Sequence, residues 1–257
     1  MKYLINLSYN GSKYYGYQIQ KNKDTVEGEL EKVLSKIFNR NINTIGASRT
    51  DRGVHAINQY CTFEVDESIN TKKLLHSLNS LLSDYVHVKI IKKVSEEFNV
   101  RHDVKRKEYI YKINMGEYNP IESEYVYQYC KSIDKELLDI FINQFKGNHN
   151  YRSFTSDKDN GNYERNVIID YKISKKVLYL RFESSGFLRY MIRNIVGLLL
   201  DINDSKKSIC DIEDIFKLKD RTSLGRCASP VGLYLNKIEY YTRNSLLFCL
   251  RNGVMII

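Results

Sequence analysis

One carboxylate, Asp51, lies between two arginines in the segment 48–56, whose sequence is SRTDRGVHA. The flanking Arg49 and Arg52 favour the ionised form of this carboxylate, because nearby positive charge stabilises an anion. An anionic aspartate in a polar loop can act as a nucleophile or as a general base. The alternative is an ordinary turn, since Asp-x-Gly is common turn chemistry.

A second pair of charged residues lies in an apolar stretch. Arg189 and Arg193 are four residues apart in GFLRYMIRNIVGLLLDI, which starts at Gly186 and has the length and composition of a buried helix. On a helix this spacing places both side chains on one face, one turn apart. A charge in such surroundings needs an anionic partner, either phosphate or carboxylate. The alternative, that the arginines face solvent at the helix edge, fits Arg189 better than Arg193.

A third signal is the basic run 101–111, RHDVKRKEYIY, which leads into alternating tyrosines. Cations that bind phosphate and rings that stack on bases occur together in proteins that bind single-stranded nucleic acid. A solvated edge strand is the alternative interpretation. Two further residues, His149 in GNHNY and Arg165 before Asn-Val-Ile, would by themselves indicate only loop structure.

The charge balance favours a nucleic-acid partner. The chain has 257 residues and a formal net charge of +9, from 40 basic and 31 acidic side chains, and the excess is spread over both halves. A balance of this kind suits a polyanion, nucleic acid first. A basic surface without such a role is the alternative.

The residue types argue against several other classes of protein. Five scattered cysteines without a CxxC pair argue against a disulfide framework and a zinc site, and they suit a reducing cytoplasm. The five histidines show no HxxxH or HExxH spacing, so we expect no metal. There is no run of 18 apolar residues and no secretion signal, so we expect a cytoplasmic protein that does not cross a membrane.

The elements that must position these residues alternate between strands and helices. In the first half, apolar spacing predicts strand-like stretches over 3–9, 41–45, 60–65, 85–94 and 107–115, and helices over 26–37 and 71–82. We place a boundary between the halves near residues 117–119, just before Pro120. After it, apolar spacing predicts a helix over 137–145 that ends at Gly147 and paired strands over 167–174 and 177–184. The apolar helix from Gly186, a short helix near 212–216 and a strand over 233–241 complete the pattern. Antiparallel-looking strands mixed with a few helices indicate an α+β fold with two halves, 1–116 and 117–257.

Seven segments share their order and sequence with one enzyme family. They are YNGSKYYGYQIQ at 9–20, TVEGELEKVL at 25–34, SRTDRGVHA at 48–56, FNVRHDVKRKEYIY at 98–111, GNHNYRSF at 147–154, FLRYMIRNIVG at 187–197 and PVGLYLNKIEY at 230–240. Together they resemble the tRNA pseudouridine synthase A family, and they run in order through nearly the whole chain. Among the departures, Tyr17 in place of the family's Trp and Arg52 in place of a small residue could alter contacts with RNA.

The resemblance implies a role for each candidate catalytic residue. Asp51 would be the nucleophile, and Arg193 would be its ion-pair partner. Tyr109 would pack on the target uracil and relay a proton. Arg49 would help to hold the flipped-out state, and His55 would shape the active-site loop. The implied substrate-binding set is Arg49, His55, Tyr109 and Arg165.

The resemblance also implies the pseudouridine synthase fold, with two RRM-like halves whose antiparallel sheets flank a central active-site cleft. The implied partner is tRNA, bound by a homodimer, with uridines 38–40 of the anticodon stem-loop as targets. Isomerisation breaks the N1–C1′ bond and rejoins the base through C5, so the base must leave its stack. The carboxylate can attack either C1′ or C6. No group leaves and nothing is oxidised, so we expect no cofactor.

Two alternatives stay open at this stage. A protein of the same fold could bind RNA without catalysis, although binding alone has no need for Asp51, Tyr109 and Arg193 together. A paralogue could instead modify ribosomal or another RNA.

Overall fold

Local sequence signals place the first two helices of the chain. Helix α1 (Val26–Phe38) begins after Thr25, whose side-chain oxygen accepts a hydrogen bond from a backbone N–H of the first turn. Helix α2 (Thr71–Leu81) begins after Asn70, which accepts in the same way. Such caps satisfy N–H groups that the first turn leaves without a helical partner. The helices predicted over 26–37 and 71–82 are confirmed.

The chain folds into two compact units. The computed structural model describes residues 1–157 and 161–241. The first unit combines residues 1–107 with the chain from Tyr234 onward, and the second unit spans 108–233. The division into contiguous halves, 1–116 and 117–257, stays a prediction.

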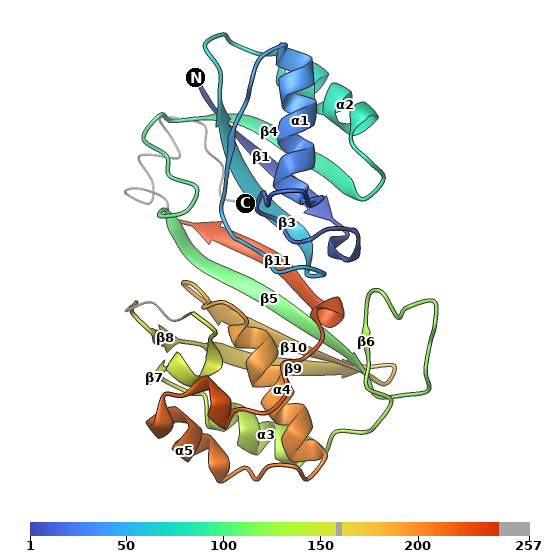
Figure 1. The fold of residues 1–257 in the computed structure, drawn as a ribbon, viewed down its shortest axis with the longest axis vertical. Coiled ribbons are helices and arrows are strands. Elements are labelled where there is room, and N and C mark those ends of the chain that lie inside the picture. Colours follow the sequence, from blue (N-terminus) through green and yellow to red (C-terminus); the bar gives the residue numbers. More distant parts are fainter. Residues whose placement is uncertain (158–160, 242–257) are drawn as a thin grey trace. The chain divides into compact units, whose positions relative to one another are not determined.

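The first unit is a sheet covered by α1 and α2. Its strands are β1 (Lys2–Tyr9), β2 (Thr44–Gly46), β3 (His55–Glu64), β4 (Val86–Val94) and β11 (Leu233–Tyr240). The order is β4-β1-β3-β11, with β2 paired to β3. Tyr3 stacks on Phe63 with ring centroids 5.6 Å apart, and Phe38 of α1 lies against the same ring. Figure 1 shows α1 and α2 together beside this sheet, and the aromatic contacts identify the face that they bury.

The second unit places three helices beside another group of strands (Figure 1). Its strands are β5 (Val104–Asn114, whose first four residues belong to the first unit), β6 (Tyr127–Gln128), β9 (Ile168–Ser174) and β10 (Val177–Ser184). The order is β5-β10-β9, with β6 paired to β5. A separate two-stranded sheet consists of β7 (Asn148–Asn150) and β8 (Glu164–Asn166). The helices are α3 (Lys135–Asn143), α4 (Met191–Asn203) and α5 (Asp211–Leu218).

The α+β class is confirmed, but the expectation of purely antiparallel sheets is wrong. β11 runs parallel to β3, and β6 runs parallel to β5. Parallel strands need a connection of a dozen or more residues between them. Both pairs have such a connection, since the second unit separates β3 from β11 and residues 115–126 separate β5 from β6.

Helix α4 starts later than its apolar sequence predicts. Its first residue is Met191, because Tyr190 before it has a φ of +62° and cannot continue a right-handed helix. Arg189 therefore precedes the helix and is exposed, whereas Arg193 lies within the helix and is half-buried. The prediction that both arginines share one helical face is wrong, since i,i+4 geometry holds only inside a helix. The greater burial expected of Arg193 is confirmed.

Candidate active site

The backbone that enters the Asp51 loop is held by three side chains of the first unit. They donate to three consecutive carbonyl oxygens: Arg101 Nε to Gly46 at 3.0 Å, Lys107 Nζ to Ala47 at 2.8 Å and Gln59 Nε2 to Ser48 at 2.6 Å. Hydrogen bonds from charged or buried donors are strong enough to restrict a loop to one path. The chain therefore reaches Arg49 and Asp51 in a defined conformation.

The loop then closes in a tight turn over Asp51–Val54. The N–H of Val54 donates to the carbonyl oxygen of Asp51 at 3.1 Å, and Gly53 has a φ of +81°. A positive φ at the third residue of a turn is the mark of type II geometry and favours glycine. The turn leaves Asp51 half-buried and Arg52 exposed. The turn that the sequence offered as an alternative is therefore present, and it leaves the Asp51 carboxylate partly accessible.

Buried tyrosine and threonine residues hold the backbone just before this turn. The hydroxyl groups of Tyr9 and Thr50 lie 2.7 Å apart, and the carbonyl oxygen of Thr50 accepts a hydrogen bond from the N–H of Tyr17 at 3.1 Å. Tyr17 itself is almost fully buried. Its replacement of the family's tryptophan therefore concerns the core of the first unit and not a surface for RNA.

His55 is a buried part of the same support. Its Nδ1 accepts a hydrogen bond from the N–H of Gly11 at 3.2 Å, so its proton is on Nε2 in the neutral form. Its ring stacks on Tyr234 with centroids 4.7 Å apart. Gly11 must be glycine here, because a Cβ would lie 1.9 Å from the carbonyl oxygen of Val54. These contacts agree with the loop-shaping role expected of His55, and its membership of the substrate-binding set stays a prediction.

The pKa of Lys107 is changed by its position next to the Asp51 loop. Burial, together with the positive charge of Arg101, lowers the pKa of the Lys107 ammonium to about 8 from an ordinary value of 10.5. The folded protein releases this proton near pH 8, whereas the unfolded chain keeps it until about pH 10.5. Because the unfolded state binds more protons in that window, the stability contributed by this group rises with pH between 8 and 10.5.

We expect this contribution to disappear when Lys107 is replaced by methionine. The difference in unfolding free energy between wild type and Lys107→Met should change by about 1–2 kcal/mol between pH 7.5 and 9.5, in favour of wild type at the higher pH. Urea denaturation at the two pH values measures it. Lys105→Met, a change at an exposed residue of the same strand, is the matched control. Parallel pH dependence in wild type and Lys107→Met would contradict this assignment.

In the second unit, Tyr109 of β5 and the segment that leads into α4 lie together. Tyr109 is buried, and its ring meets Phe187 edge to face with centroids 5.2 Å apart. The next tyrosine on the same strand face, Tyr111, donates its hydroxyl proton to the carbonyl oxygen of Ser229 at 2.6 Å. Burial raises the pKa of Tyr111 well above its usual value, so it stays protonated.

Arg193 is fixed by its own helix and by the chain near residue 228. Its Nε donates to the carbonyl oxygen of Ala228 at 2.8 Å, and the N–H of Ala228 donates back to the carbonyl oxygen of Arg193 at 2.9 Å. The guanidinium group also lies over the ring of Tyr190, 5.2 Å from its centroid. The Nε bond restrains the guanidinium group, and the backbone bond fixes residue 228 against α4.

Arg165 lies on a different sheet from Tyr109. It is on β8, where it faces His149 of β7 across the strand pair. Its guanidinium donates to the carbonyl oxygens of Asn162 and Glu164, and burial lowers its pKa. The ring of His149 stacks on Phe216 of α5 at 4.7 Å. Its place in an aromatic cluster makes His149 a packing residue, and substrate binding by Arg165 stays a prediction.

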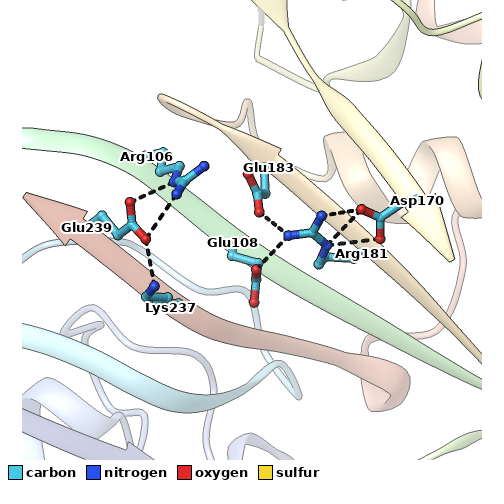
Figure 2. A network of polar contacts seen from close by, with 7 residues as sticks. All are labelled: Arg106, Glu108, Asp170, Arg181, Glu183, Lys237 and Glu239. Carbon is cyan, nitrogen blue, oxygen red and sulfur yellow. Dashed lines mark hydrogen bonds and ion pairs between the residues drawn. The ribbon is translucent and has the colours of Figure 1, made fainter. Parts of the chain in front are cut away.

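The basic run 101–111 mainly organises protein. Arg101 and Lys107 hold the Asp51 loop, and Arg106 binds both oxygens of Glu239, which also binds Lys237 (Figure 2). The sequence offered phosphate contacts and a solvated edge strand as alternatives for this run, and it did not reveal the loop-holding role. No signal in the sequence could have found it, because the hydrogen bonds are accepted by backbone carbonyl groups of a distant segment.

The second unit has an ion cluster of its own. Arg181 of β10 binds three carboxylates, on Glu108, Asp170 and Glu183 (Figure 2). Its charge is therefore more than neutralised by protein groups. We assign it to the structure of the sheet.

Among residues 1–157 and 161–241, no cluster of three or more His, Cys, Asp or Glu side chains could hold a metal ion. In the same part of the chain, no helix is long and apolar enough to cross a membrane. The four cysteines there, Cys61, Cys130, Cys210 and Cys227, are free thiols.

A family model described as tRNA pseudouridine synthase matches residues 6–103 and 141–241 of this chain. The chain belongs to the tRNA pseudouridine synthase family. It is similar to proteins named tRNA pseudouridine synthase A from Malacoplasma penetrans, Aquifex aeolicus and Mycoplasma genitalium, with identities of 38%, 37% and 36%. The alignments cover 93%, 92% and 93% of this chain, and 100%, 98% and 98% of the relatives.

Membership of the tRNA pseudouridine synthase family confirms the resemblance read from the seven segments. The matched stretches include the Asp51 loop and the part of α4 that carries Arg193. Tyr109 lies between the two stretches. The roles expected for these three residues stay predictions.

Proposed function

We propose that this protein isomerises uridine to pseudouridine at positions 38–40 of the tRNA anticodon stem-loop. Family membership supports the reaction. The observation that carries the proposal is the half-buried Asp51, presented by a turn whose entering backbone is held at three carbonyl groups. A surface that only bound RNA would have no need to fix the backbone that leads to one carboxylate.

In the proposed reaction, Asp51 attacks a uridine that has been flipped out of the stack. Attack at either C1′ or C6 lets the N1–C1′ bond break while the base stays bound. The base then turns and C5 bonds to C1′. The bond that Asp51 formed to C1′ or C6 breaks, which restores the carboxylate, the proton on C5 is lost and N1 gains one. Every atom of the substrate remains in the product, and no electrons are transferred, so these steps draw on protein groups alone.

The other residues have roles that suit their chemistry. Arg193 forms the ion pair that keeps Asp51 ionised and aimed, and its restrained guanidinium group supports this. Tyr109 stacks on the uracil and moves a proton, which a tyrosine ring and hydroxyl can do. Arg49, exposed beside the turn, holds the flipped-out state. His55 and Arg165 complete the substrate-binding set.

The proposal includes the architecture and setting that the family implies. The two RRM-like halves flank a central cleft that contains the active site, and the protein acts on tRNA in the cytoplasm as a homodimer. A homodimer would double the net charge of +9 and could present a broad basic surface. Recognition would then follow the shape and phosphates of whole tRNA.

Mapping of pseudouridine in total RNA, from cells with and without this protein, tests the function. Loss of pseudouridine at tRNA positions 38–40 alone is the expected result. Loss at ribosomal or other sites would identify a paralogue with another substrate. An unchanged map, together with tRNA binding by the purified protein, would identify a non-catalytic RNA-binding protein. Sedimentation of the purified protein tests the homodimer.

A further inference from the structure

Arg52 occupies the outward corner of the turn that begins at Asp51. It is exposed, and its guanidinium carbon lies 4.3 Å from the centroid of the Tyr15 ring. A cation over an aromatic face at this distance gains electrostatic attraction to the ring. The side chain beside the proposed nucleophile is therefore held in one direction.

Lys23 is drawn to the same ring. Its Nζ lies 4.4 Å from the Tyr15 centroid. Tyr15 is half-buried and fixed by its backbone, since its N–H donates to the carbonyl oxygen of Asp24 at 2.8 Å and its own carbonyl oxygen accepts from Gln20 Nε2 at 2.6 Å. The Tyr15 ring therefore holds the positive charges of Lys23 and Arg52 close to each other, although like charges repel.

Neither cation has a carboxylate partner among residues 1–157 and 161–241. Other surface arginines of the first unit differ in this respect. Arg40 binds Asp66 and Glu67, and Arg106 binds Glu239. The positive charge gathered at Tyr15 is therefore not neutralised by a carboxylate of the described chain and is available for an external anion.

We propose that Tyr15, Lys23 and Arg52 form a binding surface for phosphodiester groups of the RNA backbone next to the flipped uridine. We call these three residues the Tyr15 platform. The inference rests on the proposed function for the identity of the RNA. A guanidinium group stacked on a ring still directs its N–H donors outward in its own plane, and that fork matches two phosphate oxygens. The peptide link to Asp51 places the contact beside the target nucleotide.

The platform acts on affinity and not on the chemical step. Each phosphate contact adds about 0.7–0.9 to the slope of log affinity against log salt concentration. Removing the Arg52 charge should therefore lower the slope by about that amount, and should weaken binding by about tenfold, the order expected of one charge-assisted hydrogen bond. The rate of pseudouridine formation is read separately, under single-turnover conditions at saturating RNA.

The test is a salt titration of the affinity of the full-length protein for an unmodified anticodon stem-loop RNA. Arg52→Ala should show the smaller slope, and Arg52→Lys should regain the slope without the full affinity, because lysine keeps the charge and loses the fork. Arg40→Ala is the matched control, a surface arginine of the same unit that is paired with carboxylates. Tyr15→Leu should weaken binding severalfold at unchanged net charge, which a general electrostatic effect would not do.

Equal slopes for wild type and Arg52→Ala would overturn the platform, and so would an equal loss in Arg40→Ala. Single-turnover assays with the same proteins separate this outcome from failure of the proposed function. Normal pseudouridine formation with equal slopes refutes only the platform. Absence of pseudouridine in the wild-type reaction, with a reduced slope for Arg52→Ala, refutes the enzymatic function and supports the RNA surface.

Discussion

We expect that replacing Asp51 with alanine abolishes pseudouridine formation, while affinity for tRNA stays within about tenfold of wild type. Without the carboxylate no covalent step can begin, so the catalysed route is lost altogether. Phosphate contacts supply most of the affinity of a protein for nucleic acid, and Asp51 makes none. Assays of the purified variant with unmodified tRNA, for pseudouridine and for binding, measure the two effects.

Asp66→Ala is the matched control for this result. Asp66 is an exposed carboxylate of the same unit, paired with Arg40, so its loss should leave turnover unchanged. Turnover by Asp51→Ala near the wild-type rate would refute the nucleophile. Loss of binding in proportion to the loss of turnover would show that the variant has lost its fold or its RNA surface.

Arg193→Met is the second change with a large expected effect, on both activity and stability. In the proposed site it removes the counter-charge of Asp51. Because both residues are half-buried, the cost should be below the roughly 3–5 kcal/mol of a fully buried ion pair. It also leaves the carbonyl oxygen of Ala228 without its donor. We expect an inactive protein with a lower melting temperature, measured by pseudouridine assay and thermal denaturation.

Arg189→Met separates this effect from a general loss of charge. Arg189 is exposed, precedes α4, and lies over Tyr190 as Arg193 does. The two changes remove the same group from the same segment, but only one removes the bond to Ala228. Equal thermal shifts for both variants would contradict the different roles assigned to the two arginines.

The parts of the fold that local chemistry controls could be predicted from the sequence. Thr25 and Asn70 are good cap residues in front of apolar helical spacing, and both helices start where expected. The start of α4 could not be predicted in this way. Tyr190 adopts a left-handed conformation that its residue type does not favour, so tertiary packing must impose it. The apolar composition of 186–202 gives no sign of this break.

The candidate site was predictable to a similar degree. A carboxylate between arginines and an Asp-x-Gly turn are visible in consecutive residues, and the structure shows that turn. The side chains that hold the loop were not predictable, because Arg101 and Lys107 come from residues about half the first unit away in sequence. Hydrogen bonds to backbone carbonyls leave no pattern in the sequence at the accepting end. Arg101 and Lys107 therefore appear as surface cations until the fold is known.

The parallel pairing of β11 with β3 has a consequence for how the protein is made. Tyr234, which stacks on His55 behind the Asp51 loop, belongs to the last described strand of the chain. The ribosome synthesises His55 before the second unit and Tyr234 after it, so the sheet of the first unit stays incomplete while residues 108–233 are synthesised. Contacts so distant in sequence slow folding and leave strand edges exposed in the meantime. The nascent chain therefore lacks the complete support of the Asp51 loop until Tyr234 has been synthesised, and a chain that terminates before Tyr234 yields a product without that support.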